Sequence, residues 1–147
     1  KPIAALFDQA KAKRVSLIVR LPLASGLLGG RLHPGISFPK NDHRLFNSDG
    51  QCFNVGETFA GIPFNTGLSL VEELKTLVPE GMNLTQTALR WILDFDAVTV
   101  VIPGSKSPNQ IPENASASQL PSLSKSLHVK LNIFYNEKII QHIRGKY

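Results

Sequence analysis

Two short apolar runs constrain the fold of this chain more than any other feature of its sequence. VSLIV (15–19) and AVTVVIP (97–103) are continuous and rich in β-branched residues, which is typical of strands buried on both faces of a sheet. Helical patterns lie between and around them, so the order predicts parallel βα units. Two strands are few for such a sheet, because parallel strands are normally covered on both faces and have several neighbours.

Three helices are predicted before the second strand. Residues 2–14 place apolar side chains at helical spacing and end in basic residues, as the helix dipole favours. Ser69 with Glu72 forms a capping-box pattern before an apolar stripe, and Asn83 with Gln86 repeats it before another. We therefore expect helices to begin just after Ser69 and just after Asn83.

The remaining helical signals follow the second strand. Residues 110–118 predict a short helix with Pro112 in its first turn, where a missing N–H does no harm. Ser124 precedes a long final helix with regularly spaced apolar residues. Trp91, on the apolar stripe of the helix after Asn83, is expected to pack in the core rather than to contact a ligand.

A long irregular connection is predicted over residues 33–68, which are rich in Pro, Gly, Asn and Asp. Connections of this length are usually functional or mobile, and a plain surface excursion is the alternative. Phe53, Phe59 and Phe64 could form an apolar lid over a substrate or simply hold the loop against the body of the protein. Both alternatives stay open.

Composition excludes several functional classes. The 147 residues correspond to about one domain, and 42% hydrophobic residues suffice for a core. The net charge of +5 permits anion binding, but the basic residues are scattered and not interleaved with aromatics, which argues against nucleic acid. A single Cys52 excludes an intramolecular disulfide, and the four histidines are too dispersed for a zinc site.

The length of the apolar runs and the first residues of the sequence predict where the protein is located. Their length is far below the ~20 residues of a membrane span, and Lys1-Pro2 opens no signal-peptide pattern. We therefore expect a soluble cytoplasmic protein with no membrane partner.

The segment PGSKS (103–107) is the strongest candidate for a binding site. In parallel α/β folds, ligands lie beyond the carboxyl ends of the strands, and the start of a helix offers free N–H groups with a partial positive charge. Lys106 adds a full charge, and Ser105 and Ser107 add hydroxyl donors. Gly104 allows close approach of the backbone. These features suit a phosphate group.

Further polar residues follow this segment. Gln110, Glu113 and Asn114 lie one to three turns along the predicted helix and suit a base or a ribose. A solvated turn between strand and helix is the competing interpretation, since Pro, Gly and Ser are common in turns for conformational reasons alone. Chemistry by itself leaves the two alternatives open.

Three collinear stretches resemble the aldo-keto reductase family. IPGSKSPNQIPEN (102–114) resembles the family's last barrel strand and cofactor loop, and VRLPLASGLLGG (19–30) its penultimate strand and following loop. LTQTALRWILDFDAVTVVIPGSKS (84–107) matches the helix, strand and cofactor loop in the family's order. The resemblance implies the C-terminal part of a (β/α)8 TIM barrel over residues 1–147. That part comprises two parallel βα units, a long loop and a C-terminal helix.

The resemblance also implies a cofactor, NADPH. By position, Ser105 and Lys106 would hold the 2′-phosphate, with Gly104 and Ser107 close by. Lys106 favours NADP over NAD, because an acidic residue there would repel the extra phosphate. Arg20 is a candidate for the nicotinamide side. The adenosine would contact Gln110, Glu113 and Asn114, and the pyrophosphate would contact Pro22, Leu23, Ala24, Ser25 and Gly26. Pro112 departs from many relatives and changes the expected path of the helix start.

Catalysis in the family uses an Asp, Tyr, Lys and His tetrad from earlier barrel strands. The tyrosines here are Tyr135 and Tyr147, and neither follows an Asp at the family's spacing. We therefore expect a cofactor-binding part of an oxidoreductase that reduces small aldehydes or ketones only when completed by an N-terminal part. The sequence starts in a helix with no preceding strand, which fits a fragment. A non-catalytic nucleotide-binding or interaction module is the alternative. Open strand edges predict self-association.

Overall fold

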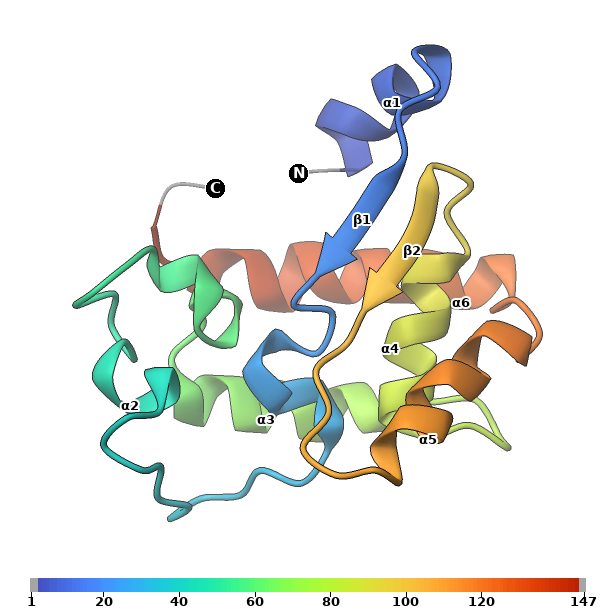
Figure 1. Cartoon of the computed structure of the whole chain (residues 1–147). Helices are drawn as coiled ribbons and strands as arrows, with labels where there is room; N and C mark the ends of the chain where they lie inside the picture. Colours follow the sequence, from blue (N-terminus) through green and yellow to red (C-terminus); the bar gives the residue numbers. More distant parts are fainter. Residues whose placement is uncertain (1–2, 146–147) are drawn as a thin grey trace.

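The two predicted strands form a parallel pair in the computed structural model, which describes residues 3–145. Strand β1 (Leu17–Arg20) pairs with β2 (Val98–Ile102), and Arg20 lies opposite Ile102 at their carboxyl ends. Figure 1 shows both arrows pointing the same way, with the helical segment from Lys125 to His142 passing behind them. The predicted parallel arrangement is confirmed.

The prediction that both faces of the strands are buried is wrong for the described residues. Ile18 is 63% exposed and Ile102 is 53% exposed. The sheet formed by residues 3–145 has two strands, so each strand has one hydrogen-bonded neighbour and one open edge. Continuous apolar strands in such a small sheet leave large side chains in contact with solvent.

Helical turns precede β1 and interrupt the long connection that follows it. The predicted helix over 2–14 is confirmed from residue 3 to residue 12, while its first position lies outside the described residues. Of the irregular connection predicted over residues 33–68, residues 33–63 are irregular apart from short helical turns, whereas residues 64–68 are helical and the prediction is wrong there. The elements up to this point are a π-helical turn η1 (Ile3–Phe7), α1 (Asp8–Ala12), a 3₁₀ segment η2 (Ala24–Gly29), α2 (His43–Phe46), η3 (Val55–Glu57) and η4 (Phe59–Gly61).

Helix α3 (Phe64–Lys75) begins five residues before the predicted Ser69 cap, so that prediction is wrong. Pro63 has an extended backbone at the N-cap, and its carbonyl accepts the first helical bond from Gly67 at 2.8 Å. The Ser69 hydroxyl lies inside the helix and donates to the Asn65 carbonyl. Burial of the first helical turns against the core outweighs the local capping signal.

The other predicted helix starts are confirmed. Helix α4 (Leu84–Leu93) opens with the Asn83–Gln86 capping box, in which each side chain accepts from the other residue's N–H. The final helix opens at Ser124, whose hydroxyl accepts from the Leu127 N–H. The elements after β2 are α5 (Gln110–Ser116), η5 (Ala117–Gln119), α6 (Lys125–Phe134), η6 (Tyr135–Ile139) and η7 (Ile140–His142).

The core lies beyond the carboxyl ends of the strands, between η2, η4, α3 and α4. Its buried residues are Leu27, Phe59, Leu68, Val71 and Leu84. Of the loop aromatics, Phe59 and Phe64 pack against each other at 5.0 Å between ring centroids. Phe53 is instead 40% exposed. Trp91, predicted to be a core residue, is half-buried and packs edge-on against Phe95.

Candidate cofactor site at the carboxyl ends of the strands

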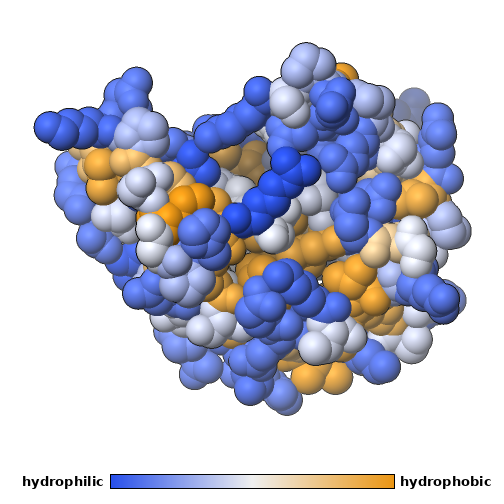
Figure 2. Space-filling view, turned by 90° about the horizontal axis from the view of Figure 1, so that it is seen from below, coloured by the Kyte–Doolittle hydropathy of each residue, from blue (hydrophilic) through white to orange (hydrophobic). Residues whose placement is uncertain are grey.

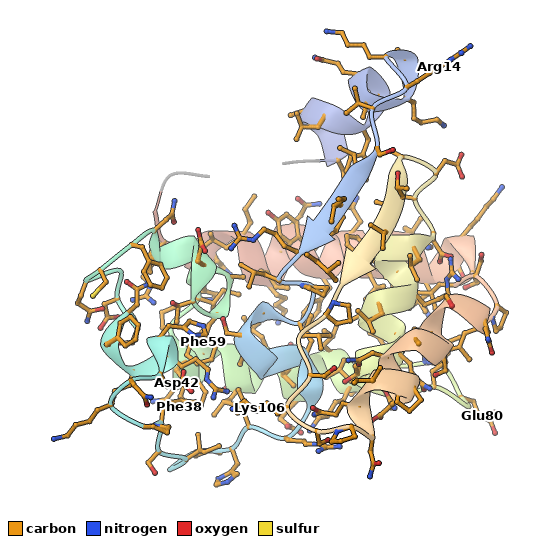
Figure 3. The ribbon with its side chains drawn as sticks, in the orientation of Figure 1. Arg14, Phe38, Asp42, Phe59, Glu80 and Lys106 are labelled. Carbon is orange, nitrogen blue, oxygen red and sulfur yellow. The ribbon has the colours of Figure 1, made fainter. Side chains whose placement is uncertain are left out.

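The structure brings the two predicted site segments to the same edge of the sheet. Because β1 and β2 are parallel and Arg20 pairs with Ile102, residues 21–26 and 103–107 leave the sheet side by side. In Figure 3, the labelled Lys106 lies beyond the arrowheads of both strands. Figure 2 views the molecule from this end, where apolar surface is visible between polar side chains.

The segment after β1 is a compact turn held in an unusual backbone conformation. Leu21, Ala24, Ser25 and Gly26 all have positive φ angles, of 54°, 47°, 57° and 98°. A positive φ is disfavoured for residues with a Cβ and persists only where the surroundings hold it. Pro22 is buried, and Leu27, just beyond the turn, is part of the core. The turn predicted to contact the pyrophosphate therefore has a defined shape.

The Ser25 hydroxyl is the hydrogen-bond centre of this turn. It donates to the Glu57 carbonyl at 3.2 Å and accepts from the Phe59 N–H at 3.1 Å. His43 Nε2 lies 3.2 Å away. A hydroxyl donates one bond and accepts two, so the set is complete when His43 carries its proton on Nε2. The long loop thus binds both the proton and the oxygen of the Ser25 hydroxyl.

Charged residues of the same loop surround the turn. Arg20, predicted on the nicotinamide side, pairs with Glu57 at 3.0 Å between partly exposed side chains. Asp42 binds Arg44 through two bonds of 2.6 and 2.9 Å. The bonds from the Arg44 guanidinium lower the pKa of Asp42 to about 2, against the raising effect of burial. Asp42 is therefore ionised at neutral pH, with His43 Nδ1 3.7 Å from its carboxylate.

The segment after β2 directs two backbone N–H groups at one point. Gln110 Oε1 accepts from the Lys106 N–H at 2.6 Å and from the Ser107 N–H at 3.2 Å. Asn114 Nδ2 donates to Ser105 Oγ at 3.1 Å. Two backbone N–H groups that donate to one oxygen can also donate to a phosphate oxygen. In this structure the side-chain amides of Gln110 and Asn114, both in α5, bind the backbone N–H groups and Ser105 instead.

The Lys106 side chain itself is exposed and projects from the β2–α5 connection (Figure 3). Among residues 3–145, no salt bridge involves its ammonium group. A Cβ added at Gly104 would meet no atom within 4 Å, so the backbone before Lys106 is open to approach. Glu113, in contrast, accepts from Asn83 Nδ2 at 3.1 Å and so links α5 to the start of α4.

Two surface hollows lie away from these segments. One of about 360 Å³ adjoins the start of α4, and one of about 220 Å³ lies at the opposite end of the strands. Their lining residues include none of those predicted to contact the cofactor. The first hollow is lined by Gly29, Gly30, Lys75, Val78, Asn83, Leu84 and Thr85, and the second by Ala10, Lys11, Arg14, Val15, Ser16, Asp96, Ala97 and Thr99.

Sequence reasoning missed the loop residues that surround Ser25. His43, Glu57 and Phe59 are 18 to 34 positions from Ser25, and no local motif marks them. Within the described part of the chain, no three His, Cys, Asp or Glu residues are grouped as metal ligands would be. None of the helices formed by residues 3–145 has both the length and the apolar character needed to cross a bilayer.

Comparison with known proteins identifies relatives of this chain. The profile of the aldo/keto reductase family matches residues 4–135. An aldo-keto reductase of Strobilurus tenacellus is 31% identical over 121 residues, which cover 81% of this chain and 33% of that protein. The L-glyceraldehyde 3-phosphate reductase of Escherichia coli K12 is 32% identical over 112 residues, which cover 76% of this chain and 31% of that protein. The chain thus spans about a third of the length of these relatives.

A solved structure supports the same relationship at the level of the fold. The glycerol dehydrogenase AKR11B4 of Gluconobacter oxydans superposes with a TM-score of 0.73 at 19% sequence identity. The match covers 99% of this chain and 42% of the dehydrogenase. The parallel strands and helices are consistent with part of a TIM barrel. The chain therefore belongs to the aldo/keto reductase family.

Proposed function

We propose that this chain is the C-terminal, cofactor-binding part of an NADPH-dependent aldo-keto reductase that reduces aldehydes or ketones to alcohols. The observation that carries the proposal is the exposed Lys106 ammonium, set between Ser105 and Ser107 at the carboxyl end of β2. Curated relatives named as reductases support a reductase-type function. Bound NADPH would supply a hydride to the carbonyl carbon of the substrate.

The residues at the strand ends fit the cofactor chemically. Lys106, Ser105 and Ser107 would hold the 2′-phosphate, since an unpaired cation with neighbouring hydroxyls suits an anion. The turn from Pro22 to Gly26 would contact the pyrophosphate through its backbone, because the Ser25 hydroxyl is already used within the protein. The adenosine would contact Gln110, Glu113 and Asn114.

The proposal assigns no proton-transfer step to this chain. The family's acid is a tyrosine from an earlier barrel strand, and neither tyrosine of this sequence matches its motif. We therefore expect no carbonyl reduction by the chain alone. The same observation favours a second candidate, a non-catalytic nucleotide-binding or interaction module.

Lys106→Ala tests the cofactor assignment. Fluorescence titrations with NADPH and with NADH give the preference for NADPH as the ratio of the two dissociation constants. This ratio should fall at least tenfold in the variant. One well-made charged contact to phosphate contributes about 1.5–3 kcal/mol. Lys13→Ala, at the C-cap of α1 before the amino end of β1, is the matched control and should keep the preference. An unchanged preference in Lys106→Ala would contradict the assignment.

Complementation separates the two candidate functions. The N-terminal barrel portion of a family member, carrying the tetrad, is supplied in trans, and NADPH oxidation is measured with an aldehyde. Activity that requires both parts supports the reductase. Dinucleotide binding without activity under the same conditions supports the non-catalytic module.

We also propose that the isolated chain self-associates through the open sheet. Ile18, Val100 and Ile102 expose 40–63% of their surface, and the sheet formed by residues 3–145 has two strands, each with one open outer edge. Exposed apolar strand edges are sites of pairing with another chain. A second copy of this chain has the same open strand edges and is the partner that we propose.

A further inference from the structure

Arg144 connects the segment after the last helical turn to the long loop. Its backbone N–H and its Nε both donate to the Gly61 carbonyl, at 3.1 and 2.9 Å. Its Nη2 donates to the Ser48 carbonyl at 2.9 Å, and its Nη1 donates to the Asp49 carboxylate. The guanidinium thus joins three loop groups that lie 83 to 96 positions away in the sequence.

Two glycines allow the close approach of these segments. A Cβ at Gly61, which has a φ of +77°, would lie 2.8 Å from the Arg144 carbonyl oxygen. A Cβ at Gly145, with a φ of +87°, would lie 2.8 Å from Val55 Cγ1. Neither position accepts a larger residue without displacement of its neighbour. The junction depends on backbone-level contact from both sides.

The loop held by Arg144 also forms the bonds to Ser25. Phe59 lies two residues before Gly61, is 1% exposed, and has a φ of 51°. Its N–H donates to Ser25 Oγ, and the Glu57 carbonyl accepts from the same hydroxyl. A strained segment that persists in this conformation must be held by its surroundings. Arg144 holds one end of this segment, and Ser25 holds the other.

We propose that Arg144 is a positioning residue for the strand-end site. By fixing Gly61 and residues 48–49, it keeps Phe59 and Glu57 against Ser25 and so maintains the shape of the turn from Pro22 to Gly26. Only the last step, from the shape of that turn to dinucleotide binding, rests on the proposed function. Within residues 3–145, the hydrogen bonds of Arg144 go to Gly61, Ser48 and Asp49, none of which is predicted to touch the cofactor.

The full chain carrying Arg144→Met tests the proposal without any ligand. We expect the Phe59 amide to exchange with solvent at least tenfold faster by NMR, because its bond to Ser25 opens more often. Exchange at the buried Leu89 of α4 should stay unchanged. A nitroxide on Cys52, the sole cysteine and an exposed one, should become more mobile in its electron paramagnetic resonance spectrum.

Three further variants define the result. Lys138→Met removes an exposed ion pair with Glu73 and should leave Phe59 exchange unchanged. Arg144→Lys keeps a positive charge near Asp49 without the fork that reaches both carbonyls, so it should restore part of the protection. Asp49→Ala removes the carboxylate that Arg144 binds and keeps both backbone carbonyl partners, so it should raise Phe59 exchange at least twofold even if Arg144→Met does not fold.

The outcomes separate this inference from the proposed function. Unchanged Phe59 exchange in the folded variants overturns the positioning role, and so does an equal rise at Leu89, which indicates global destabilisation. In a second arm, NADPH should bind about threefold more weakly to Arg144→Met than to Lys138→Met. Equal affinities despite faster Phe59 exchange overturn the link to the cofactor turn. If no variant binds NADPH, the proposed function fails, while the exchange data still decide the role of Arg144.

Discussion

Asp94, which follows α4, binds the final helix and the residue before its N-cap. Its side chain is 6% exposed and accepts from Arg90 at 3.0 Å, from the Leu123 N–H at 2.9 Å and from His128 at 2.9 Å. Burial raises the pKa of Asp94, but the bonds from His128 and Leu123 and the Arg90 charge outweigh it and leave a net lowering. One carboxylate therefore links three segments.

Replacement of Asp94 by Ala should lower the free energy of unfolding by about 3 kcal/mol, because it leaves the nearly buried Arg90 without its ionic partner. Urea denaturation measures the change. Asp96→Ala is the control: its ion pair with Lys11 is exposed, and the expected change is within about 0.5 kcal/mol. Equal effects of the two substitutions would contradict the role given to Asp94.

The stability supplied by Asp94 should also depend on pH. Its pKa in the folded protein lies below the usual value of 3.8, so its stabilising effect is complete above that value. The effect is lost as the pH falls through the lower folded pKa. Between pH 5 and about 2, the free energy of unfolding should therefore fall less steeply for Asp94→Asn than for the wild type. Urea denaturation at several pH values measures this.

At the level of elements, the capping box decides where α4 begins and also anchors α5. The Asn83 side chain accepts from the Gln86 N–H at 2.8 Å and donates to Glu113 at 3.1 Å. Asn83→Ala should lower the free energy of unfolding by about 1 kcal/mol or more, because it removes a helix cap and a hydrogen bond between α4 and α5. Ser69→Ala, whose hydroxyl caps no helix, should change it by less than about 0.5 kcal/mol. Thermal denaturation of both variants compares a real cap with a sequence that only resembles one.

For the whole molecule, exposed strand surface predicts concentration-dependent association. Sedimentation should show oligomers at micromolar concentration, and Ile18→Ser with Ile102→Ser should weaken the association at least tenfold. Burial of one such side chain contributes about 1.5–3 kcal/mol. Val129→Ser on α6 removes an equally exposed apolar residue away from the strands and should have little effect. A wild-type chain that remains a compact monomer contradicts the edge argument.

Local patterns sufficed for several features of this protein. The β-branched runs predicted two parallel strands, and side-chain chemistry at Asn83 and Ser124 predicted the first residues of two helices. These features depend on residues close together in the chain, whose propensities and capping bonds act locally. The family was also evident from collinear stretches, and its match over residues 4–135 confirms it.

Other features were decided only by tertiary contacts. Helix α3 begins at Phe64 because its first turns pack into the core, and the Ser69 motif could not reveal that. The bonds that the loop makes to Ser25 and Arg144 join residues 18 to 96 positions apart. A sequence contains no local signal for such pairs, because which distant groups meet is set by how the chain packs. The sequence alone thus determined the two strands, the starts of α4 and α6 and the family, whereas the three-dimensional arrangement determined where α3 begins and which groups surround the strand ends.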